Sequence, residues 1–394
     1  MIRKFSSLIA ASFGVLALGA MGPAGAAELP ALPKTPITVN VLDVAGNLAL
    51  TQKAFDDYRQ THPQLVSRFV FTKATAPEVP AKVLAQQNAN RVDIDMILTG
   101  TDALAAGIEQ GLWTRMLPDF AQKFPNLQAS YLPPAAAMLK LAADQGILIT
   151  YYPSGPLLEY APERVKDAPN SAETLLTWCQ AHPNRFMYAR PSNSGPGRTL
   201  LMGLPYLLGD KDPMDPINGW DKTWAYLKEL NSCIEYYPSG TGVTMQSLGN
   251  GSVDMIASTT GWDINPRALG VVPESAKIAT LKGFHWVTDA HYVVVPKGLQ
   301  PDHLAVVLDV IAFLLQPKEQ AYAFDEGYFY PGPAVKDVPI TLAPKSSQDV
   351  IKQFGRPEYE ALIANNPKEV PLDAKGLVAA FRKWDELIGG AKTR

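Results

Sequence analysis

The chain has 394 residues, too many for one ordinary hydrophobic core, which suggests two lobes. Hydrophobic residues make up 47% of the chain and charged residues 19%, a balance that excludes a disordered protein. The formal net charge is −3, and basic residues do not cluster with aromatic ones, so we expect no nucleic-acid partner.

The N-terminus has the pattern of a secretory signal peptide. Arg3 and Lys4 precede an apolar stretch at 8–21, and small residues follow at 24–26. The alternative is a membrane anchor, but that needs roughly 20 apolar residues and this stretch is shorter and interrupted by glycine. We therefore predict that residues 1–26 are a signal peptide and that the mature protein is exported.

The chain has two cysteines, Cys179 and Cys233. In an oxidising compartment such a pair suggests one disulfide, and the alternative is two buried thiols. Two cysteines cannot form a structural zinc site alone, and the sequence has no HExxH motif, so we expect no metal.

The first part of the mature chain alternates between strand and helix patterns. Strands are predicted at 37–42, 65–72 and 93–98, and helices at 48–61, 80–89 and 103–109. This alternation implies βαβ units and a largely parallel sheet, which together form one α/β lobe.

A buried strand at 146–152 interrupts this alternation, and a second α/β lobe follows. Helices are predicted at 172–180, 198–208 and 219–231, and strands at 185–189 and 253–257. The segment GFHWVTDAHYVVVP at 283–296 then joins a polar and aromatic first half to a core strand at 292–295. A helix at 304–315 and a largely helical tail complete the chain.

Four small polar loops are candidate ligand sites, because ligands of open parallel sheets lie beyond the carboxyl ends of the strands. The loops are 45–47, 99–102, 192–199 and 259–263. Each offers backbone N–H groups near a helix start, although N-caps and tight turns look the same in sequence. The richest loop, 192–199, lacks the GxGxxG and Gly-Lys-Ser/Thr patterns, so it indicates no nucleotide site.

The sequence contains no recognised catalytic motif. A GxSxG elbow and a paired-carboxylate motif are both missing, and the pair Asp289 and His291 lacks a third metal ligand. We therefore expect neither an enzyme nor a cofactor, with a secreted hydrolase as the alternative class.

Five segments, taken in order, carry a family resemblance. They are a helix face with Phe55 and Tyr58 followed by His-Pro, DIDMILTGTDALAAGIEQGLW at 93–113, GILITYYPSGPL at 146–157, LGNGSVDMIASTTGW at 248–262 and FLLQPKEQAYAFDEGYFYPGP at 313–333. The sequence resembles the periplasmic solute-binding proteins of ABC importers, in the class with spermidine/putrescine-, thiamine- and ferric-ion-binding members. The resemblance implies a type II binding-protein fold, in which two α/β lobes joined by crossing strands close on a ligand cleft. Lobe 1 would comprise 27–150 and 285–394 with the C-terminal helices, and lobe 2 would comprise 151–284.

The resemblance also implies a monomeric periplasmic receptor that delivers a small polar organic solute to a membrane permease. A sensor co-receptor would use the same fold. We expect ligand contacts from Asn47, Thr101, Asp102, Asn193, Ser194, Arg198, Thr260, Trp262, Trp286 and Asp289.

An organic cation such as a polyamine or a thiamine-like compound is the first ligand hypothesis, because two tryptophans and two acids are available. Arg198 and the glycine-containing loop favour an anion or a zwitterion instead, and a polyol is a further alternative. Spermidine-type members have Trp-x-Asp where this chain spaces Trp286 and Asp289 as Trp-x-x-Asp, which would place them on opposite strand faces and disfavours a polyamine. The adjacent tyrosines of ferric-ion members are replaced by Thr259-Thr260-Gly261-Trp262, which disfavours iron.

Overall fold

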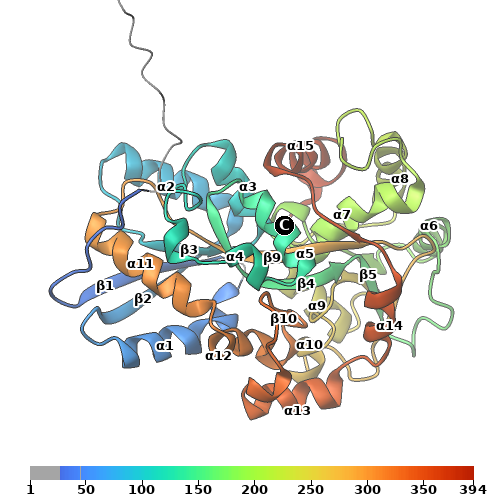
Figure 1. The fold of residues 1–394 in the computed structure, drawn as a ribbon. Coiled ribbons are helices and arrows are strands. Elements are labelled where there is room, and N and C mark those ends of the chain that lie inside the picture. Colours follow the sequence, from blue (N-terminus) through green and yellow to red (C-terminus); the bar gives the residue numbers. More distant parts are fainter. Residues whose placement is uncertain (1–26, 45) are drawn as a thin grey trace, which may run out of the picture.

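The computed structural model describes residues 27–44 and 46–394. The predicted signal peptide, residues 1–26, lies outside the described residues. Two α/β lobes lie side by side, and the long strands β4 and β9 run between them (Figure 1). The expected fold class, a two-lobed type II binding protein, is confirmed.

The first lobe is built on a seven-stranded sheet with the order β10-β4-β9-β3-β1-β2, and β11 pairs with β9. The strands are β1 (Ile37–Val44), β2 (Val66–Ala74), β3 (Met96–Thr99), β4 (Gly146–Gly155), β9 (Trp286–Val294), β10 (Gly332–Pro333) and β11 (Lys368–Glu369). β1 is parallel to β2 and β3, but β9 is antiparallel to both β3 and β4. The three strands on which the prediction of a parallel sheet was based, β1, β2 and β3, do pair in parallel, but the sheet as a whole is mixed, because β9 returns from the second lobe and enters in the opposite direction.

Helices cover the first sheet and supply its core. They are α1 (Gln52–Thr61), α2 (Val79–Asn88), α3 (Thr101–Glu109), α4 (Leu127–Ser130), α5 (Pro133–Leu139), α11 (Pro301–Leu314) and the short α12 (Pro317–Gln320). α1 is an amphipathic helix with one apolar face toward the core. Its residues Ala54, Phe55 and Tyr58 recur at helical spacing and are fully buried, while the rest of the helix is largely polar.

The second lobe has a four-stranded sheet with the order β6-β7-β5-β8. Its strands are β5 (Leu157–Tyr160), β6 (Phe186–Met187), β7 (Met255–Ser258) and β8 (Lys277–Ala279), and its helices are α6 (Ala172–Ala181), α7 (Gly195–Leu208), α8 (Asp221–Asn231), α9 (Thr241–Gly249) and α10 (Asn265–Ala268). A disulfide joins Cys179 on α6 to Cys233 just beyond α8, the pair for which the sequence suggests a bridge.

The chain crosses between the sheets through β4, which continues into β5, and returns through β9. The two crossing strands pair with each other from Gly146 opposite Val294 to Gly155 opposite Val287. This paired ribbon connects the two sheets.

The C-terminal segment contains α13 (Lys345–Phe354), α14 (Glu358–Asn365) and α15 (Ala374–Trp384). α15 lies against α3 of the first lobe, yet its residues Leu377, Ala380 and Trp384 belong to the hydrophobic core of the second lobe. The last helix therefore bridges both lobes, which departs from the expected assignment of the whole tail to lobe 1. The remaining lobe limits stay a proposal.

Candidate ligand site

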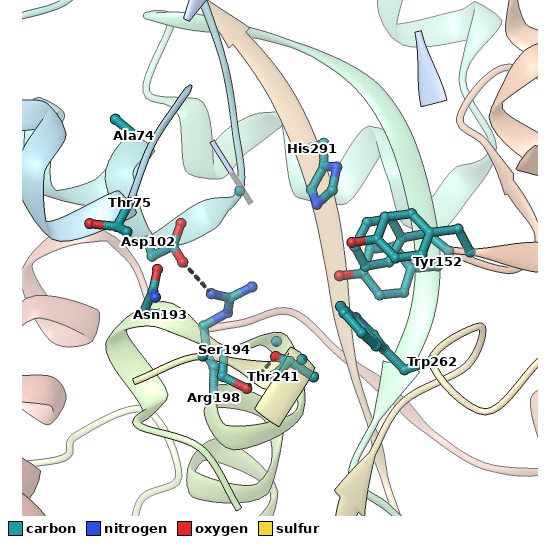
Figure 2. A pocket seen from close by; sticks show the side chains of 16 residues that line it. Ala74, Thr75, Asp102, Tyr152, Asn193, Ser194, Arg198, Thr241, Trp262 and His291 are labelled. Carbon is teal, nitrogen blue, oxygen red and sulfur yellow. Dashed lines mark hydrogen bonds and ion pairs between the residues drawn. The ribbon is translucent and has the colours of Figure 1, made fainter. Parts of the chain in front are cut away.

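A pocket of about 240 Å³ lies between the lobes, where α3, α7 and α9 begin. Three helix N-termini meet here, so free backbone N–H groups and positive dipole ends face one space. Asp102, Asn193 and Arg198 form a polar half, and Tyr152 and Trp262 belong to an aromatic half on the other side of Arg198 (Figure 2). The pocket thus presents two chemically different walls to one ligand.

The start of α7 is fixed by its local sequence. The Ser194 hydroxyl accepts the N–H of Gly197 at 3.1 Å, which caps the helix, and it lies 2.8 Å from the hydroxyl of Thr241 at the start of α9. Gly197 is required because a Cβ there would lie 2.1 Å from the carbonyl oxygen of Ala189. The cap and the close approach together bring the next residue, Arg198, to the pocket.

Arg198 is the central charge of the site, and its side chain is only 3% exposed. Its Nη1 donates to the carboxylate of Asp102 at 2.9 Å, and its Nη2 donates to the carboxylate of Asp289. Asp102 lies in the first turn of α3 in the first lobe and Arg198 lies on α7 of the second, so the first of these ion pairs crosses the cleft. Burial alone would lower the pKa of Arg198, but the two carboxylates raise it overall, so the guanidinium stays charged.

Asp289 lies behind Arg198 and does not line the pocket. Its carboxylate accepts hydrogen bonds from the Tyr152 hydroxyl at 2.9 Å, from the Thr101 hydroxyl at 3.3 Å and from the N–H of Ala290 at 2.9 Å. With so many partners it holds Arg198 in place from the core side. Asp102, Asp289 and Arg198 together carry a formal charge of −1.

The aromatic half consists of Tyr152, Trp262, His291, Tyr328 and Phe329. Phe329 lies at its centre, with ring centroids 4.5 Å from His291, 4.7 Å from Tyr152 and 4.3 Å from Tyr328. Burial lowers the pKa of His291 to about 4, so this ring is neutral at pH 7. Aromatic faces of this kind attract cations and apolar groups.

Five of the ten predicted ligand residues line the pocket: Asp102, Asn193, Ser194, Arg198 and Trp262. Trp262 reaches it because Gly261 has a φ of 92°, and a Cβ there would lie 2.4 Å from the carbonyl oxygen of Tyr328. Sequence reasoning thus identified part of the polar half and one ring of the aromatic half.

The other five predicted residues lie outside the pocket wall. Thr101 and Asp289 stand behind Arg198, and Thr260 exchanges hydrogen bonds with Ser154 at 2.9 and 3.2 Å. Asn47 is fully buried beside the carbonyl of Thr99.

Trp286 is also a core residue, and its indole N–H donates to the carbonyl oxygen of Leu362 at 3.0 Å. Asp289 lies on the opposite face of β9, where it meets Arg198, and this agrees with the expected strand alternation. The tryptophan therefore does not reach the solute pocket.

Several pocket residues were not in the predicted set. They are Ala74, Thr75, Tyr152, Thr241, His291, Tyr328 and Phe329, with Gly100, Gly195, Gly240 and Gly242. Thr241 follows a glycine and begins a helix, as residues of the predicted loops do. It does not follow a predicted strand, so the search for loops at the carboxyl ends of strands did not include it. Tyr328 and Phe329 come from the EGYFYPGP segment, whose place in the fold depends on distant contacts.

Two α/β lobes joined by crossing strands, with a polar and aromatic pocket between them, define a two-lobed solute-binding protein. Residues 53–353 match the family model described as bacterial extracellular solute-binding protein, and the chain belongs to this family. The description of this family places its members outside the cytoplasm, and the match confirms the predicted resemblance to solute-binding proteins.

Solved structures support the same fold. An ABC transporter substrate-binding protein from Bradyrhizobium japonicum is 20% identical, with a TM-score of 0.61 over 89% of this chain and 99% of that one. A putative spermidine/putrescine ABC transporter protein from Listeria monocytogenes is 15% identical, with a TM-score of 0.60 over 88% and 97%. The periplasmic binding protein AfuA from Actinobacillus pleuropneumoniae, with fructose-6-phosphate bound, is 14% identical, with a TM-score of 0.62 over 89% and 98%. At these identities the likeness shows the fold alone.

No curated protein matches this chain in sequence. Among residues 27–44 and 46–394, no helix has both the length and the apolarity needed to span a bilayer. Within the same described part, no three His, Cys, Asp or Glu side chains are grouped as a metal site would need.

Proposed function

We propose that this chain is a monomeric periplasmic receptor that binds a small zwitterionic organic solute and delivers it, unchanged, to the permease of an ABC importer. The solutes named for similar folds include a sugar phosphate, ferric ion and GABA, so fold likeness does not choose among them. The choice rests on the chemistry of the pocket.

The carrying observation is that Asp102 and Arg198 face the pocket side by side. A guanidinium has five N–H donors and a carboxylate about four lone pairs. Each group therefore keeps hydrogen-bonding capacity for a solute after Asp102 and Arg198 have paired with each other. An ammonium group of a solute would donate to the carboxylate of Asp102. A carboxylate group of the solute would accept hydrogen bonds from Arg198 and from the N–H groups at the starts of α7 and α9. The carbon skeleton between them would lie against the aromatic half.

This proposal differs from the first hypothesis of a simple organic cation. That hypothesis used two tryptophans and two acids, but Trp286 lies in the core and both acids contact Arg198. A simple cation remains the second candidate, because the three charged groups sum to −1 and the aromatic half would stabilise a positive charge.

Binding without catalysis agrees with the surroundings of the pocket hydroxyls. The Ser194 hydroxyl interacts with Thr241 and with the N–H of Gly197, and the His291 ring lies among Tyr152 and Phe329. A hydrolase would need a base within reach of its nucleophile. A solute that contacts both lobes would favour the closed arrangement, as delivery to a permease requires.

The experiment is a thermal-shift and calorimetry screen of the mature protein with matched compounds. We would use ω-amino acids of two to six carbons, the alkylamines that lack the carboxylate and the alkanoates that lack the amine. We expect the largest rise in melting temperature from an amino acid, because a ligand at 100 times its Kd stabilises by about 2.7 kcal/mol. Response to amines alone would favour the second candidate, and response only to polyols or phosphates would refute both.

A further inference from the structure

A second, smaller pocket of about 190 Å³ lies on the other side of Asp102. Ala76 and Pro77 of the first lobe line it, as do Ser192 of the second lobe and Phe381 of α15. Asp102 lines both pockets, so this residue lies at the boundary between them. Three separate parts of the chain therefore meet around this space.

The wall between the two pockets is thin. Thr75 lines the first pocket and Ala76, the next residue, lines the second. On the facing side Asn193 lines the first pocket and Ser192 lines the second. Residues 76–78 contact residues 191–193 across the cleft, and this contact makes the wall. Separation of the lobes would break it and join the two spaces into one cleft.

The second pocket has a carbon-rich lining. Ala106 on α3 and Val378 and Phe381 on α15 are half-buried and border it, so part of their apolar surface is uncovered. Of the charged groups there, the Arg190 guanidinium is paired, because it donates through Nε to the Asp385 carboxylate at 3.0 Å and through Nη2 to its other oxygen, and Arg382 is exposed to solvent. This surface suits an apolar group better than a second charge.

We propose that this second pocket is a subsite for an apolar substituent of the same solute, a short alkyl group or small ring next to the charge that binds Asp102. The proposal rests on the proposed function and narrows its substrate class to zwitterions with such a substituent. Because Asp102 borders both spaces, a group attached near the solute ammonium would enter the second pocket while the lobes are apart, and the wall of residues 76–78 and 191–193 would then close around it. There it would contact both lobes and α15, so its burial would favour closure.

The test uses N-alkyl derivatives of the ω-amino acids, carrying methyl, ethyl and propyl groups, with calorimetry on the mature protein. We expect about fourfold tighter binding for each added methylene until the pocket is full. Phe381→Ala should remove most of this gain, whereas Leu387→Ala should leave it intact. Leu387 is a matched control because it is an apolar side chain of the same segment, 39% exposed and outside the pocket.

A second variant protects the test against a folding defect in Phe381→Ala. Ala106→Leu should fill the subsite, so that the N-propyl compound loses its gain while the unsubstituted amino acid keeps its affinity. If the amino acid binds but the alkyl groups give no gain, or if the gain survives in both variants, the subsite is refuted and the proposed function stands. If no amino acid binds, the proposed function fails and the subsite with it.

Discussion

Asp102 and Asp289 both contact Arg198, but the structure gives them different tasks. Asp289 is buried behind the guanidinium with three further hydrogen bonds, whereas Asp102 lines the pocket and meets Arg198 across the cleft. The same isosteric change, Asp→Asn, therefore tests two different roles. At position 289 it tests whether the carboxylate holds Arg198 in place, and at position 102 it tests whether the carboxylate contacts the solute.

The magnitudes follow from burial. Asp289→Asn leaves the Arg198 charge, 3% exposed, with Asp102 as its one carboxylate partner. Breaking a buried ion pair costs about 3–5 kcal/mol, and the remaining partner places the expected loss of unfolding free energy near 3 kcal/mol. Asp102→Asn should cost less, about 2 kcal/mol, because it removes one charge-assisted hydrogen bond and leaves Arg198 paired with Asp289. It should also weaken binding of the solute ammonium by about 2 kcal/mol, or roughly 30-fold in Kd.

Urea unfolding of the solute-free protein and calorimetry with the tightest amino acid would measure the two effects. Glu386→Gln, at an exposed acid, controls for the loss of one negative charge. We expect Asp289→Asn to be the less stable variant and Asp102→Asn to be the weaker binder. If Asp102→Asn destabilises as much, or if Asp289→Asn weakens binding more, the assignment of support and contact is wrong.

Three further predictions concern buried groups. Burial lowers the pKa of His291 from 6.5 to about 4, so the unfolded chain binds a proton there at a higher pH than the folded chain does. The unfolding free energy should therefore fall by up to about 3 kcal/mol as the pH falls from 6.5 to 4. Urea titrations at stepwise pH would measure this dependence, and His291→Gln should remove it. Glu159 should give the opposite pH dependence, because burial and, to a smaller extent, repulsion from Asp263 raise its pKa from 4.5 to about 8. The unfolding free energy should fall as the pH rises from 4.5 to 8, and Glu159→Gln should reduce this dependence. Trp286→Ala should cost about 3–5 kcal/mol of unfolding free energy, whereas Trp262→Ala should mainly weaken solute binding; equal losses of stability would contradict the placement of Trp262 at the pocket.

The sequence by itself determined most of the local structure. Most predicted strands and helices lie within a few residues of their predicted positions, because hydrophobic periodicity and helix capping act between neighbours in the chain. The strand predicted at 292–295 is an exception, since β9 begins at Trp286 and is buried over its whole length. Elements such as α5, α9, β5 and β8 were not predicted. Polar loops before α3 and α7 also pointed to the pocket, since a helix start exposes N–H groups wherever it lies.

The tertiary structure decided which of those residues share a surface. Strand alternation alone could separate Trp286 from Asp289, but only the packing of α7 on β9 shows that Asp289 holds Arg198 from behind. Tyr328 and Phe329 join Tyr152 through contacts between segments far apart in sequence. Such contacts depend on the path of the whole chain, and so do the direction of β9 and the bridging position of α15. No local pattern encodes them.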